Sequence, residues 1–139
     1  MVTAYDLGTE SCRPVPNLNH ARWDHINCIV GNFLCVTGGR SGDFGYPILN
    51  SIEMLDLRDL KTSWSSGQHD CQWNLVSDPI FTNTFYARVC CQVNDTELLV
   101  LGFKIDSPSR EQAAWKFDTN RDGSFKKDVP YPEDKYISR

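Results

Sequence analysis

The sequence has no long apolar run, no apolar leader and no basic cluster, and each absence excludes a class of protein. Its longest apolar stretch, Leu98–Phe103, is far shorter than the roughly 20 residues of a membrane-spanning helix. Residues 1–20 contain no apolar segment of the kind that directs secretion. The longest basic run is Lys126–Lys127, and 14 Lys and Arg against 18 Asp and Glu give a net charge of -4. We therefore expect a cytoplasmic or nuclear protein that binds neither membranes nor nucleic acid.

Metal-site spacing is also lacking. Six cysteines occur without a Cys-x-x-Cys pair, and the only candidates for metal or thiol chemistry are His69 with Cys71 and the vicinal Cys90–Cys91. One histidine and one cysteine supply half of a tetrahedral site, and adjacent strand residues point to opposite faces of a sheet. No Ser, His and Asp stand in a recognisable catalytic context. We therefore predict reduced cysteines, no metal, no cofactor and no catalytic residue.

Helical periodicity is nearly absent. Apolar residues come in short runs of four to seven, bounded by Gly, Asn, Asp, Pro and Ser, which is typical of an all-β protein. Gly31-Asn32 and Asn94-Asp95 are turn signals, and each predicts a local antiparallel hairpin. The predicted strands are 2–6, 10–14, 24–30, 32–38, 51–57, 62–66, 88–94, 97–103, 112–118 and 124–129.

A long-period repeat runs through these strands. Three of them end with a large apolar residue followed by aspartate, at Tyr5-Asp6, Leu55-Asp56 and Phe117-Asp118. Each aspartate stands where a turn begins, so we expect its carboxylate to accept a hydrogen bond from the backbone amide two residues on. The other repeating positions are arginines, glycines that we expect to lie where a Cβ does not fit, and later aromatic residues: Arg22, Gly38, Gly39, Trp64, Arg88, Gly102 and Phe125.

The order of these residues resembles the Kelch repeat. Its blades run from an arginine through a hairpin ending in Gly-Gly to a strand ending in aromatic-Asp and then a strand with tryptophan, and residues 22–66 match this order best. The resemblance implies β-propeller blades of four antiparallel strands. We assign 1–21 to the C-terminal half of a blade, 22–87 to a full blade with an insertion near 69–81, and 88–139 to a degenerate blade.

About two and a half blades form an incomplete ring, because closed propellers have four to eight. We therefore expect a fragment of a longer Kelch-type protein, or a module completed by another chain. The resemblance implies a noncatalytic protein-interaction module, as in propellers that serve as substrate receptors of ubiquitin ligases or as actin and scaffold binders. The alternative is a fragment of a propeller enzyme of the galactose oxidase or sialate isomerase type, which would need catalytic side chains converging on the propeller axis.

The loops after the second strands of the two later blades are the candidate partner surface. Loops on that face of a propeller commonly carry binding, and arginine and aromatic residues dominate binding hot spots. Arg40, Phe44 and Tyr46 lie on the first of these loops, and Arg110 lies on the corresponding loop at 104–111. We predict that these four residues contact a protein partner.

Overall fold

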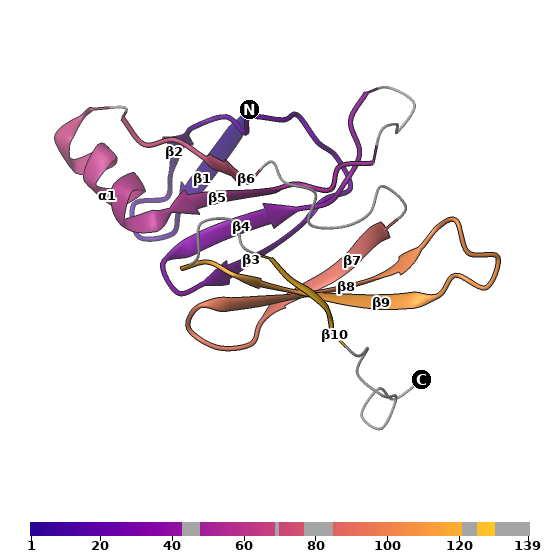
Figure 1. Cartoon of the computed structure of the whole chain (residues 1–139). Helices are drawn as coiled ribbons and strands as arrows, with labels where there is room; N and C mark the ends of the chain where they lie inside the picture. Colours follow the sequence, from indigo (N-terminus) through magenta and orange to yellow (C-terminus); the bar gives the residue numbers. More distant parts are fainter. Residues whose placement is uncertain (43–47, 69, 77–84, 121–124, 130–139) are drawn as a thin grey trace.

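The computed structural model describes residues 1–42, 48–68, 70–76 and 85–120, and the backbone of 125–129. These residues form three antiparallel sheets, which we call the N-terminal hairpin, the central sheet and the C-terminal sheet (Figure 1). The hairpin pairs β1 (Val2–Asp6) with β2 (Ser11–Val15). The central sheet has the order β3 (Ile26–Val30), β4 (Phe33–Thr37), β5 (Ile52–Asp56) and β6 (Asn74–Val76). The C-terminal sheet runs from β7 (Phe85–Gln92) through β8 (Glu97–Lys104) and β9 (Gln112–Asp118) to β10 (Phe125–Val129).

The all-β prediction is confirmed, and both larger sheets contain four antiparallel strands. Each of these sheets is built from strands that are consecutive in the sequence, so its topology is a simple meander. Within the described residues the sheets do not close into a ring, and the propeller arrangement stays a prediction. The single helix in the described part of the chain, α1 (Leu57–Ser66), is too short and too polar to cross a membrane.

The prediction of a strand at 62–66 is wrong, because those residues belong to α1. Asp56 is the N-cap and accepts from the Arg58 amide at 2.8 Å, while Gly67 ends the helix with a φ of 69°. Such caps satisfy backbone groups that have no partner inside the helix. Trp64 therefore lies on a helix rather than on the fourth strand of the sheet. That fourth strand is β6, inside the range near 69–81 that the sequence indicated as an insertion.

The three repeated aspartates adopt one local structure. The Oδ1 atoms of Asp6, Asp56 and Asp118 accept from the backbone amides two residues on, at 2.8, 2.8 and 3.0 Å. This turn prediction is confirmed at all three positions. Each aspartate ends the strand next to the last strand of its sheet, so β1, β5 and β9 are equivalent, and so are β2, β6 and β10.

The central sheet lies between the other two, and its two faces carry different apolar clusters. The cluster toward the C-terminal sheet includes Val30, Cys35, Ile52 and Met54 together with Phe85, Leu98, Val100 and Phe117. The cluster on the opposite face includes Val36, Leu55, Leu60 and Trp73, with Val15 of β2 packed against it. Alternate residues of one strand thus serve opposite faces, as strand geometry requires.

The glycine prediction is confirmed where the two larger sheets meet. A Cβ on Gly102 would lie 2.1 Å from the Tyr86 carbonyl oxygen, and one on Gly38 would lie 2.9 Å from the Ala87 Cβ. Gly38 also has a φ of 68°, a conformation that residues with a Cβ rarely adopt. Glycine at these positions lets the chain directly after β4 approach β7 and lets β8 approach its partner β7 closely.

Candidate partner-binding surface

A buried ion pair fixes the start of the central sheet. The side chains of Arg22 and Glu53 are both 0% exposed, and Arg22 Nη2 lies 2.8 Å from Glu53 Oε1. Arg22 Nη1 also donates to the Gly38 carbonyl at 3.0 Å. The carboxylate of Glu53 accepts from the backbone amides of Asn19 at 2.6 Å and His20 at 3.0 Å. One network therefore joins the segment before β3 to β5 and to the end of β4.

Opposing effects act on the carboxyl group of Glu53. Burial raises its pKa, because the charged form loses its hydration. The amides of Asn19 and His20 and the guanidinium of Arg22 outweigh that cost, and the pKa lies below its usual value. Glu53 is therefore ionised at neutral pH and balances the buried charge of Arg22.

This network positions Arg40. The Gly38 carbonyl, two residues before Arg40, accepts a hydrogen bond from Arg22. Trp23, the residue after Arg22, exchanges two backbone hydrogen bonds with Arg40, at 3.0 and 2.9 Å. The Arg40 guanidinium lies 5.8 Å from the Trp23 ring centroid and 5.0 Å from that of Tyr86. Guanidinium groups bind aromatic faces at these distances, so Arg40 contacts two rings, one from the segment before β3 and one from β7.

The C-terminal sheet supplies two more cations. The register of β7 against β8 shifts between Ala87 and Val89, so Arg88 occupies a bulge, and its guanidinium lies 6.0 Å from the Tyr86 ring. Bulges change the direction of a side chain in this way. Tyr86 is opposite Phe103 on β8, with ring centroids 5.5 Å apart. Arg110 lies 5.7 Å from the Phe103 ring.

These side chains surround a hollow of about 330 Å³, which we call the arginine surface. Two aromatic rings and three cations line it, and the Tyr86 hydroxyl donates to the Asp24 carboxylate. Such a surface suits a ligand with carboxylates and some apolar area, because guanidinium groups bind carboxylates in a bidentate manner. The lining residues are Arg40, Tyr86, Arg88, Phe103, Ile105 and Arg110.

Two of the four predicted partner residues meet at this surface. Arg40 and Arg110, 70 positions apart in the sequence, both line the hollow. Phe44 and Tyr46 lie outside the described residues. The sequence did not indicate Tyr86, Phe103 or Ile105, and it indicated Arg88 only as a repeat position. These residues can be identified only when the β7–β8 register is known, because that register places Tyr86 opposite Phe103.

The repeat arginines differ in environment. Arg22 precedes β3 and its side chain is fully buried, whereas Arg88 lies inside β7 and is exposed. The predicted start of a strand at 88 falls three residues after the observed start at Phe85. The equivalence between the two sheets therefore rests on the aspartate turns and glycines rather than on these arginines.

The cysteines of the sheet interface are packing groups. All six cysteines are free, and Cys28, Cys35 and Cys90 lie in or against the core between the two larger sheets. Burial raises the pKa of Cys35 to about 12, and a hydrogen bond with Cys28 together with burial raises that of Cys90. The same hydrogen bond lowers the pKa of Cys28. Cys35 and Cys90 are therefore neutral thiols, which are poor nucleophiles and poor metal ligands. Within the described residues no three His, Cys, Asp or Glu side chains gather closely enough to hold a metal ion.

Comparison with models of known protein families found no match, and comparison with curated proteins found none either. The Kelch resemblance therefore depends on the sequence pattern.

Proposed function

We propose that this chain is a noncatalytic protein-interaction module of the Kelch type, and that its arginine surface binds an acidic segment of a partner protein. The observation that carries the proposal is the convergence of Arg40, Arg88 and Arg110 on one hollow that Tyr86 and Phe103 also line. Ubiquitin-ligase components or substrates, and actin, are the partner classes that the Kelch resemblance implies.

The arrangement favours binding because two of the cations are already held in place. The backbone bonds to Trp23 and the rings of Trp23 and Tyr86 restrict Arg40, and the Phe103 ring lies beside Arg110. A side chain that is ordered before binding loses less conformational entropy when the partner arrives. Ile105 is 42% exposed beside the cations and offers apolar contact to a residue between two partner carboxylates.

A peptide-binding experiment tests the proposal. The probe is a fluorescein-labelled decapeptide of alternating glutamate and leucine, and its anisotropy is followed as the chain is added. We expect the double variant Arg40→Ala/Arg110→Ala to bind about tenfold more weakly than the original chain, as for loss of a binding hot spot. Added salt should weaken binding to the original chain.

The matched control is Arg58→Ala/Lys61→Ala, which removes the same charge from exposed positions of α1. A lysine-leucine decapeptide controls for nonspecific attraction to apolar surface. Equal losses in both double variants, or equal binding of the two peptides, would contradict the proposal.

A further inference from the structure

One face of the central sheet leaves apolar side chains of β3 and β4 uncovered or only partly covered, at Ile29 and Leu34. Ile29 is opposite Leu34 and Asn27 is opposite Val36 in the β3–β4 register, so these four side chains share one face. Ile29 is 54% exposed. The N-terminal hairpin and α1 lie over the β5–β6 half of the same face, where Leu55, Leu60 and Trp73 are buried.

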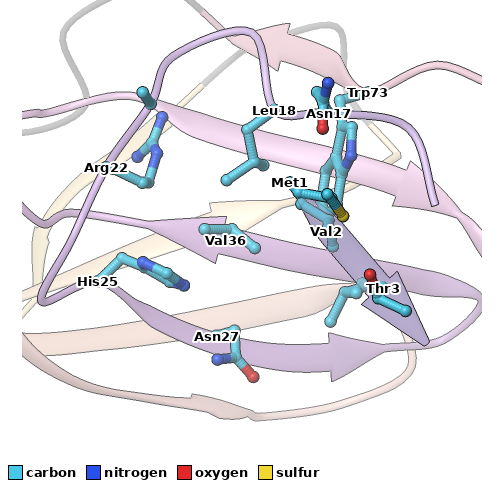
Figure 2. Close-up of a pocket in the computed structure, with 12 residues that line it drawn as sticks. Met1, Val2, Thr3, Asn17, Leu18, Arg22, His25, Asn27, Val36 and Trp73 are labelled. Atoms are coloured by element: carbon cyan, nitrogen blue, oxygen red, sulfur yellow. The ribbon is translucent and has the colours of Figure 1, made fainter. Parts of the chain in front are cut away.

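A groove runs along the boundary between the covered and uncovered halves. Its volume is about 740 Å³, and Figure 2 shows Met1, Val2 and Thr3 on one side of it and Arg22 and His25 on the other. Leu18 and Val36 lie between them (Figure 2). We call this space the β1 groove. Within the described residues β1 pairs only with β2, so its other edge faces the groove with unpaired backbone groups.

The C-terminal sheet shows how such a face looks when it is covered. Leu34 is opposite Leu55, just before Asp56, and Leu98 is opposite Phe117, just before Asp118. Leu98 is therefore the counterpart of Leu34, and by the same registers Val100 is the counterpart of Val36. Leu98 and Val100 are 0% and 1% exposed, because the central sheet covers them. Leu34 is only partly buried, whereas Val36 is already 5% exposed beside Leu55 and Trp73.

The part of the central sheet that the N-terminal hairpin leaves uncovered is two strands wide. The strands β5 and β9, which are equivalent to β1, each have two further strands on the side away from the last strand of the sheet. The hairpin ends at β1, so it is two strands narrower than the sheet that it covers. Neighbouring strands lie about 4.8 Å apart, which leaves room about 10 Å wide over β3 and β4.

We propose that the β1 groove binds a β-hairpin of a partner polypeptide, and that the nearer strand of this hairpin pairs antiparallel with β1. Main-chain hydrogen bonds to the open edge supply affinity, and alternate side chains select the partner. Apolar residues on the inner face of the bound hairpin cover Ile29 and Leu34. This binding mode is independent of the arginine surface, which lies at a different part of the fold.

The chain contains a suitable probe, because β3–β4 is the hairpin at the corresponding place in the central sheet. The probe is a peptide of residues 26–37 with Cys28→Val and Cys35→Val, cyclised through a D-Pro-Gly turn so that it stays a hairpin. By equivalence of Asp6 with Asp56, its Leu34 aligns with Tyr5 and its Val36 with Thr3.

The control peptide carries N-methyl groups at its Leu34 and Val36. In a hairpin with a two-residue loop the flanking residues, here Val30 and Phe33, bond to each other, and the pairing alternates along the strands. The amides of Leu34 and Val36 therefore point away from β3, toward the strand on the other side. Methylating them blocks pairing with β1 and leaves the peptide hairpin intact.

Titration of the ¹⁵N-labelled chain with each peptide, followed by NMR, decides the matter. We expect amide shifts on β1 and on Asn27 and Ile29, slower hydrogen exchange along β1, and no such changes with the methylated peptide. Ile29→Glu should weaken binding about tenfold, whereas Val89→Glu, at a 52% exposed position of β7, should not.

The proposal is overturned if no β1 amide shifts at about 1 mM peptide, a level that detects even millimolar affinity. It is also overturned if the methylated peptide binds equally well. The Arg40→Ala/Arg110→Ala variant should bind the hairpin peptide normally, so failure at this groove and failure at the arginine surface are distinguishable.

Discussion

Glu53 illustrates how one side chain sets local architecture. It is an acid in the middle of an apolar strand, with a side chain that is 0% exposed, and it accepts hydrogen bonds from Asn19, His20 and Arg22. A buried charge is tolerated only when it is paired and fully hydrogen-bonded. The Glu53 carboxylate therefore helps to hold the segment before β3 on the sheet, together with the bonds of Arg22 and Trp23 to Gly38 and Arg40.

We expect Glu53→Gln to lower the free energy of unfolding by roughly 3 kcal/mol at pH 7, since it leaves Arg22 buried without its counter-charge. The pKa of Glu53 is lowered from 4.5 on folding, so its contribution is present above pH 4.5 and is lost as the pH falls through the lower folded value. In urea unfolding, the free energy of unfolding should therefore fall less between pH 7 and pH 3 in the variant than in the original chain.

The control is Glu97→Gln, whose carboxylate lies 3.7 Å from Lys116 and is partly exposed. Its effect at pH 7 should stay below about 1 kcal/mol, as for surface ion pairs. Equal effects of the two substitutions would show that the buried network does not stabilise the fold in this way.

At the residue scale the sequence predicts a position when its requirement is local. The turns at Asp6, Asp56 and Asp118 depend on atoms two residues apart, and all three form as expected. The Glu53 network was missed because its partner Arg22 is 31 positions away and nothing in the local pattern connects them. An acid flanked by Ile52 and Met54 in a buried strand is the signal that such a partner exists.

At the scale of elements, α1 is the largest departure from expectation. The Kelch pattern required a strand with a tryptophan, and Trp64 stands at the right distance after Asp56. The sequence also carries a helical signal, because Leu57, Leu60 and Trp64 lie three and four positions apart and pack on one cluster. The N-cap Asp56 and the C-terminal Gly67 complete it.

The Asp56 N-cap should contribute measurably to the stability of α1. We expect Asp56→Ala to cost about 1 kcal/mol of stability, because the Arg58 amide and the Arg58 guanidinium both lose an acceptor. Asp59→Ala, also in the first turn, should cost only a few tenths of a kcal/mol through the helix dipole. Thermal unfolding of both variants gives the comparison, and equal losses would argue against capping as the cause.

For the molecule as a whole, two indole groups attach the N-terminal hairpin to the rest. Trp64 Nε1 donates to the Pro14 carbonyl at 2.7 Å, and Trp73 Nε1 donates to the Pro16 carbonyl at 2.8 Å. The Arg13 guanidinium lies 5.2 Å from the Trp64 ring. The repeat pattern predicted separate groups of strands, but the donors that join them come from α1 and from the segment before β6, which it did not predict.

We expect Trp73→Phe to loosen this attachment, because phenylalanine keeps an aromatic ring but has no N–H to donate to the Pro16 carbonyl. Hydrogen exchange should become faster in β1 and β2 and stay unchanged in β7, β8 and β9. Trp23→Phe removes an equivalent bond, to the Gly42 carbonyl at 3.1 Å, and serves as the control. Uniformly faster exchange in the Trp73 variant would mean a global loss of stability instead.

Two prolines, one in β2 and one directly after it, leave only the β1 edge of the hairpin fully able to pair with further strands. Pro14, opposite Thr3 in the register, has no N–H, and Pro16 follows directly after the strand. An incoming strand finds missing donors along β2 and a full set along β1. Recruitment of further strands is therefore one-sided, and the sheet resists the open-ended stacking that leads to fibres while it keeps one edge available.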